Sequence, residues 1–220
     1  MKLRTFFRIS GASAAWTTLV AKYIVEATSG EHANHFAALL DYLSYFTHLS
    51  VFLVALAFST VLLGPEDGLR KFFEKPATRA AIALYIIAVA VVHHLLLADL
   101  QVRAGWSAAT NTMLHTVIPI LYVIDWLVYA PKRRMTYRAI PFWLIYPAAY
   151  GVWAVGTGYI AGAYPYPFLD LNKLGLPGVG ISMAGFVALF SIGAALFITI
   201  GKIVPPPVAT MYSNTRVERR

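Results

Sequence analysis

Residues 80–97 read AAIALYIIAVAVVHHLLL, an uninterrupted apolar run that decides the fold class of this chain. A helix needs roughly 17–25 such residues to cross about 30 Å of bilayer hydrocarbon. Five further runs meet the same requirement, so the sequence predicts an all-α polytopic membrane protein, a bundle of six transmembrane helices joined by short loops. The predicted spans are Ile9–Ala27, Tyr42–Leu63, Ala80–Leu97, Ser107–Tyr129, Ile140–Ile160 and Leu176–Gly201.

The composition agrees with this fold class. A soluble domain carries about 25% charged residues, whereas this chain carries 13% and is 59% hydrophobic. We expect a single membrane domain over residues 1–204, followed by a flexible cytoplasmic tail over residues 205–220. The absence of cysteine removes disulfides, thiolate metal sites and a cysteine nucleophile. In so apolar a chain, the net charge of +8 indicates cations gathered on one face of a membrane, with no binding of nucleic acid.

The cations are divided unevenly between the two sides of the predicted bundle. Of the 18 Lys and Arg residues, only Lys22, Arg103 and Lys173 fall on the poorer side. Because cytoplasmic loops retain Lys and Arg, both termini are predicted on the cytoplasmic side. The first run contains Lys22 and Glu26, and no clear small-residue cleavage site follows it. We therefore interpret it as a retained helix and not as a signal peptide.

Polar side chains in three of the predicted spans fall at a similar depth. Ionisable groups inside a bilayer are costly, and by default they mark function. With the second and fourth spans running inward and the third running outward, these residues are all expected in the outer half of the membrane. They are Thr47, His48, His93, His94, Asn111 and His115.

The fourth span has the clearest polar stripe. Asn111, His115, Tyr122 and Asp125 recur at helical spacing, so they share one face that should point into the bundle. Pro119 has no N–H, which removes the helical partner of the His115 carbonyl, and we expect the helix to bend or loosen there. His115 is the strongest functional candidate, because the stripe and the proline coincide at this point.

Structural roles compete with functional ones elsewhere. A lone interior His or Asn often serves only to hold helices together. His93 and His94 lie near the outer end of their span, which favours an interfacial or structural role. For Asp125, a structural or charge-balancing role is as consistent with the sequence as a functional role.

Three segments resemble one known family. Residues 111–119, NTMLHTVIP, followed by Asp125, resemble the helix-4 signature of the androgen-induced gene one protein and the androgen-dependent TFPI-regulating protein. Tyr45-Phe46-Thr47 resembles the segment with their reactive threonine, and residues 166–170, YPFLD, resemble their Tyr-Pro-Phe-Leu-acidic motif between helices 5 and 6. The short loops and basic tail look more like the bacterial six-span branch of the family.

The resemblance implies a transmembrane threonine hydrolase that cleaves fatty acid esters of hydroxy fatty acids, or related acyloxyacyl lipids, without a cofactor. Thr47 would be the nucleophile and His115 the general base. Asn111 could orient His115 or donate to the oxyanion, and His48 is another candidate donor. The expected partners are the lipid ester and membrane lipids, with the site in the outer half of a bacterial inner membrane. Further candidates for the polar pocket are His93, His94, Tyr122, Asp125 and Asp170.

Two other function classes fit the same residues. The four histidines at positions 48, 93, 94 and 115 could bind a metal or haem, as histidines do in other helical bundles. A small lipid or solute transporter is the third interpretation, although the sequence shows no internal repeat. Metal content and a visible spectrum would test the first alternative, and labelling of Thr47 by a hydrolase probe would argue against both.

Overall fold

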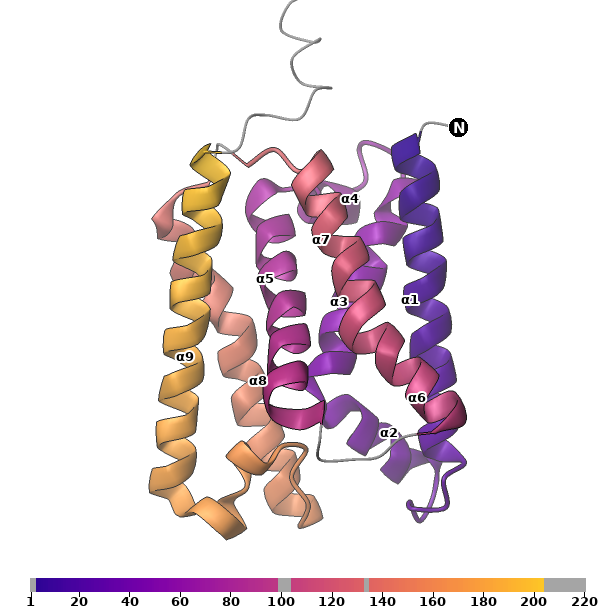
Figure 1. Ribbon diagram of the computed structural model, residues 1–220, viewed down its shortest axis with the longest axis vertical. Helices are drawn as coiled ribbons and strands as arrows, with labels where there is room; N and C mark the ends of the chain where they lie inside the picture. The colour runs from indigo at the N-terminus through magenta and orange to yellow at the C-terminus, as the bar shows by residue number, and fades with distance from the viewer. Residues whose placement is uncertain (1–2, 99–103, 133–134, 204–220) are drawn as a thin grey trace, which may run out of the picture.

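The computed structural model describes residues 3–98, 104–132 and 135–203, and these residues form helices joined by short loops, without strands (Figure 1). The tail predicted after residue 204 lies outside the described residues. The helices are α1 (Leu3–Ala27), α2 (His35–Ser44), α3 (Phe46–Ser59), α4 (Gly68–Phe73), α5 (Pro76–Val92), α6 (Gly105–Thr112), α7 (Ile118–Tyr129), α8 (Ile140–Ala161) and α9 (Leu171–Ile203). Short 3-10 turns occur at η1 (Thr60–Leu62), η5 (Tyr137–Ala139) and η6 (Pro167–Leu169), and π-helical segments at η2 (His93–Leu97) and η4 (Met113–Val117).

Four helices of the described chain are long and apolar enough to cross a membrane, which fits an integral membrane protein. They are Pro76–Leu97, Gly105–Tyr129, Tyr137–Ala161 and Leu171–Ile203, and they match the third to sixth predicted spans. The bent pair of α2 with α3 and η1 would make a fifth. The first predicted span lies within α1, which is not among these helices. The count of six spans therefore stays a prediction.

The second predicted span, Tyr42–Leu63, is wrong as a single straight helix. The chain bends by 83° between α2 and α3, and Tyr45 at the bend has extended backbone angles (φ −92°, ψ 126°). Hydropathy could not reveal this bend, because apolar residues occupy both sides of it. Its consequence is that Thr47 lies in the first turn of a helix and not in the middle of one.

The helices pack side by side, with one exception (Figure 1). α1 begins and α9 ends at the same end of the bundle, near α4. α2 lies across the opposite end, where the loop between α8 and α9 also lies (Figure 1). We call this the α2 end.

α1 packs closely against α3 through small side chains. An added Cβ at Gly11 would lie 2.8 Å from the Phe58 ring, and Ala12 and Ala15 are buried beside it. Small residues allow helix backbones to approach closely where no hydrophobic effect drives helices together in lipid. A second, smaller apolar cluster at the α2 end includes Tyr150 of α8 and Leu169 of η6. It joins the α8–α9 loop to the bend between α2 and α3.

Candidate functional site

Thr47 lies at the break between α2 and α3, as the second residue of α3. No side chain caps the first turn of this helix. The first N–H groups of a helix have no partner within it and carry a partial positive charge. Thr47 therefore projects from a helix start whose backbone N–H groups favour any negative charge that develops beside the hydroxyl.

Side chains from α3 and α8 hold this break in place. The His48 Nδ1–H donates to the Tyr42 carbonyl at 2.7 Å, and the two rings stack with centroids 4.0 Å apart. The Tyr150 hydroxyl donates to the Ser44 carbonyl at 2.7 Å. Both bonds satisfy carbonyls that the interrupted helix leaves without partners. His48, expected as an oxyanion donor, thus uses one ring nitrogen to stabilise the bend.

His115 lies in contact with Thr47, as predicted. Its Nε2 is 3.3 Å from the Thr47 Oγ1, and its Nδ1 is 3.0 Å from the Asn111 carbonyl. Because a carbonyl only accepts, Nδ1 carries the proton and the Nε2 lone pair faces the Thr47 hydroxyl. Residues 113–117, just before Pro119, form the π-helical segment η4, so the predicted loosening of this helix is confirmed.

His93 belongs to the same group of side chains. It lies in η2, the second π-helical segment, and its ring stacks on the His115 ring with centroids 3.8 Å apart. The Asn111 side-chain amide donates to the His93 Nε2 at 3.2 Å. His93 is only 7% exposed, and these contacts bring it into the group around Thr47, so of the interfacial and structural roles expected for it the burial fits the structural one. His94, also a candidate for the polar pocket, is exposed, and its ring faces the Ala90 carbonyl.

Tyr166 is a site residue that sequence reasoning did not select. It precedes η6, is buried, and its hydroxyl is within hydrogen-bonding reach of the Thr47 side chain and of the Phe46 and Thr47 backbone. The signal was present in the YPFLD segment, of which only Asp170 was chosen. The Asp170 carboxylate instead accepts two backbone N–H groups at the start of α9, at 2.9 and 3.3 Å, and so shapes the loop that carries Tyr166.

A narrow apolar cavity lies on one side of Thr47, and we call it the apolar slot. Its volume is about 70 Å³. The slot-lining residues Ala148 and Val187 are exposed on the outside of the bundle, Val187 by 42%. These two exposed residues, one on α8 and one on α9, place the rim of the slot at the outside of the bundle. Its other lining residues include Ala88, Val92, Gly151, Met183 and Phe190.

A larger cavity, which we call the polar basin, lies on the other side of Thr47. Its volume is about 850 Å³, and ionisable side chains line much of it. His115 and Asn111 line the basin but not the slot. The two cavities meet at side chains that line both of them, namely Thr47, His93, Leu97 and Tyr166.

Asp125 and Tyr122 lie away from this site. The Asp125 carboxylate accepts two bonds from the Arg8 guanidinium, at 2.9 and 3.0 Å, and one from Arg79 at 2.5 Å. Glu74 also pairs with Arg8. Burial by itself would raise the pKa of Glu74, but the nearby guanidinium groups bring the pKa below its ordinary value. Neither Asp125 nor Tyr122 lines the slot or the basin, so the predicted stripe serves two separate parts of the bundle.

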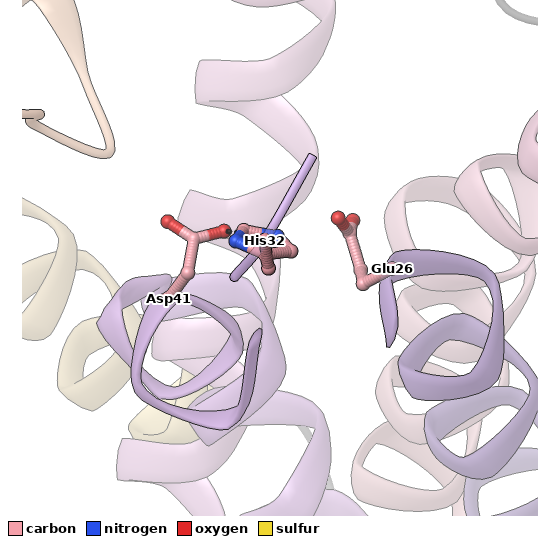
Figure 2. A group of neighbouring side chains, drawn as sticks. All are labelled: Glu26, His32 and Asp41. Carbon is pink, nitrogen blue, oxygen red and sulfur yellow. Dashed lines mark ion pairs between the residues drawn. The ribbon is translucent and has the colours of Figure 1, made fainter. Parts of the chain in front are cut away.

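The histidines of the metal or haem alternative do not gather into one metal-binding group. Within the described residues, the group whose ligand atoms all lie within 4.8 Å of one another consists of Glu26, His32 and Asp41 (Figure 2). It includes none of the four histidines proposed from the sequence. Figure 2 shows the carboxylates of Glu26 and Asp41 on either side of His32.

Comparison with known proteins gives one match. A family model described as FAR-17a/AIG1-like protein matches residues 80–202, which covers more than half of the chain. No curated protein and no solved structure matches the chain.

Proposed function

Because this chain belongs to the FAR-17a/AIG1-like family, we propose that it is an intramembrane hydrolase that cleaves lipid esters with Thr47 as nucleophile and His115 as general base. The observation that carries the proposal is the 3.3 Å contact between Thr47 Oγ1 and His115 Nε2 at the start of α3. A threonine hydroxyl is a weak nucleophile and needs an adjacent base in the correct tautomer. The bond from His115 Nδ1 to the Asn111 carbonyl provides that tautomer.

The first half of the reaction transfers the acyl group to the protein. Thr47 Oγ1 attacks the ester carbonyl carbon while His115 Nε2 takes the hydroxyl proton. The carbonyl oxygen becomes negative, and the first-turn N–H groups of α3 and the Tyr166 hydroxyl, which lie beside Thr47, are the proposed donors to it. The bond to the alcohol oxygen then breaks, and His115 returns the proton to that oxygen.

The second half releases the acid. Water from the polar basin adds to the acyl-threonine carbonyl, and His115 again takes a proton from the attacking oxygen. The bond to Thr47 Oγ1 breaks, the threonine recovers its proton, and a fatty acid leaves. The basin, whose lining includes His115, allows water to reach this carbonyl.

The apolar slot, with exposed residues of α8 and α9 in its lining, supports a long-chain ester as the substrate class. A long-chain ester can pass from the bilayer between α8 and α9 without crossing water. The family resemblance supplies fatty acid esters of hydroxy fatty acids and acyloxyacyl lipids as candidates. The cation distribution favours cytoplasmic termini, so we propose that the α2 end, with the site, faces the outer side of a bacterial inner membrane.

The test combines covalent labelling with kinetics in detergent or vesicles. Thr47→Ala should abolish labelling by a fluorophosphonate probe and lower ester hydrolysis by about 10²–10⁴-fold, and His115→Ala should do nearly the same. The double variant should be no worse than either single one, because the two residues act as a unit. His94→Ala is the matched control, since this exposed histidine lies outside both cavities. Full activity in folded Thr47→Ala protein would refute the proposal.

A further inference from the structure

Thr47 stands where two cavities of opposite character meet, and this asymmetry orients the substrate. The slot is narrow and apolar, whereas the basin is about 850 Å³ and is lined by charged side chains. An ester has two halves, the acyl chain and the alcohol. If its carbonyl is at Thr47, one half extends into each cavity.

The position of His115 decides which half of the ester occupies the slot and which occupies the basin. After taking the Thr47 proton, His115 must return it to the alcohol oxygen as that oxygen leaves. His115 lines the basin and does not line the slot. The alcohol half therefore lies in the basin, and the acyl chain leaves Thr47 through the slot.

The charges of the basin then constrain the alcohol. Two lysines line it, and each is paired with its own carboxylate: Lys22 with Glu26 at 2.5 Å, and Lys173 with Asp170 at 3.3 Å. Two further carboxylates, those of Glu31 and Asp41, also line the basin. His32 Nε2 lies 3.8 Å from the Asp41 carboxylate but is charged only when protonated. Even then, the described lining has more negative than positive charge.

We propose that this chain selects esters whose acyl chain enters the apolar slot and whose alcohol half is cationic or neutral, and disfavours esters whose alcohol half carries a carboxylate. The inference rests on the proposed function and refines its substrate class. A hydroxy fatty acid as the leaving alcohol would bring its own carboxylate into a basin whose described lining already has more carboxyl groups than lysines. Like charges at short range repel, more strongly where solvent is partly excluded.

The charge preference is tested with three palmitoyl esters of similar shape: choline, its neutral isostere 3,3-dimethylbutanol, and 4-hydroxybutanoate. The kcat/KM of each ester is divided by the rate constant of its own hydroxide-catalysed hydrolysis, which corrects for differences in intrinsic reactivity. EDTA is present so that no divalent cation binds Glu26, His32 and Asp41 and neutralises their charge. We expect the choline ester to exceed the carboxylate ester by about tenfold or more at low salt, with the ratio shrinking at high salt as the charges are screened. Glu31→Gln with Asp41→Asn should move the ratio toward one. Glu66→Gln, which changes an exposed carboxylate paired with Lys71, should leave the ratio unchanged.

The orientation of the acyl chain is tested on α8. Ala148→Trp narrows the slot and should lower kcat/KM for palmitoyl choline at least tenfold while sparing butanoyl choline. Ala149→Trp is the matched control, because Ala149 is also exposed but does not line the slot. Equal losses for long and short chains would overturn the orientation.

The outcomes separate this inference from the proposed function. Hydrolysis of all three palmitoyl esters without discrimination, or a preference for the carboxylate ester, would overturn the charge assignment and leave Thr47 chemistry standing. No hydrolysis of any ester together with no labelling of Thr47 would overturn both.

Discussion

At the residue scale, the candidate site depends on how each polar atom is bonded. His115 has one nitrogen on a backbone carbonyl and the other on the Thr47 hydroxyl. The Asn111 side chain holds His93 against the His115 ring, while its carbonyl sets the tautomer. Asn111 thus contacts both histidines, one through its side chain and the other through its backbone carbonyl.

Tyr166→Phe tests the hydroxyl beside Thr47 that we propose donates to the oxyanion. We expect kcat for ester hydrolysis to fall by about 10²-fold with little change in KM, because the hydroxyl stabilises charge that exists only in the transition state. The ring remains and continues to pack on Phe168, so thermal unfolding should shift little. Tyr159→Phe, at an exposed position of α8, is the control. An unchanged kcat would assign Tyr166 to packing alone.

At the element scale, the site is built from three irregularities in otherwise regular helices. The bend at Tyr45 exposes the start of α3, and the π-helical segments η2 and η4 contain the stacked His93 and His115. A π turn adds one residue and rotates the following face of a helix by about 100°. Such segments are common at functional sites. A regular α-helix over residues 113–117 would direct His115 elsewhere.

Asp125 tests how the elements are joined at the other end. Asp125→Asn removes the buried carboxylate that both Arg8 and Arg79 contact and leaves Glu74 as the remaining carboxylate beside them, which should lower the free energy of unfolding by about 3–5 kcal/mol. Probe labelling of the folded fraction should persist, because Asp125 lies about 15 Å along the helix from His115. Denaturant unfolding in detergent measures the change. Glu66→Gln, in an exposed pair, should stay within about 0.5 kcal/mol. Equal stability of the two variants would contradict a role for Asp125 in joining α1, α5 and α7.

At the scale of the whole molecule, the bundle has distinct ends and one lateral opening. The buried arginine–carboxylate cluster occupies the end where α1 begins, and the basin occupies the α2 end. The slot opens between α8 and α9. A lipid substrate and water would therefore reach Thr47 by different routes, which suits hydrolysis of a membrane lipid.

The topology predicted from the cations is testable in cells. Reporters fused after Arg134 and after Asn172 should report opposite sides of the membrane, with the Arg134 fusion cytoplasmic, because Lys and Arg are retained inside. Alkaline phosphatase and green fluorescent protein fusions form a matched pair for this measurement. The same side for both positions would rule out α8 as a membrane-spanning helix.

The amino-acid sequence by itself determined the spanning helices from residue 76 onward, because a bilayer imposes a length and an apolarity that hydropathy measures directly. It also determined the loosening before Pro119, since a missing N–H is a local chemical fact. The polar stripe and the family resemblance together predicted Thr47 and His115 as a pair, and the two side chains are in contact.

Only the tertiary structure decided the rest. The bend at Tyr45 is held by Tyr150, which lies about a hundred residues away in the chain, and Asp125 finds Arg8 across an even longer separation. Tyr166 lies beside Thr47 because of the path of the α8–α9 loop, and the composition of that loop does not predict its path. Periodicity reports which face of one helix is polar, but not which other helix that face meets. Partner choice depends on packing and on the need of every buried polar group for a hydrogen bond, and both exist only in the assembled bundle.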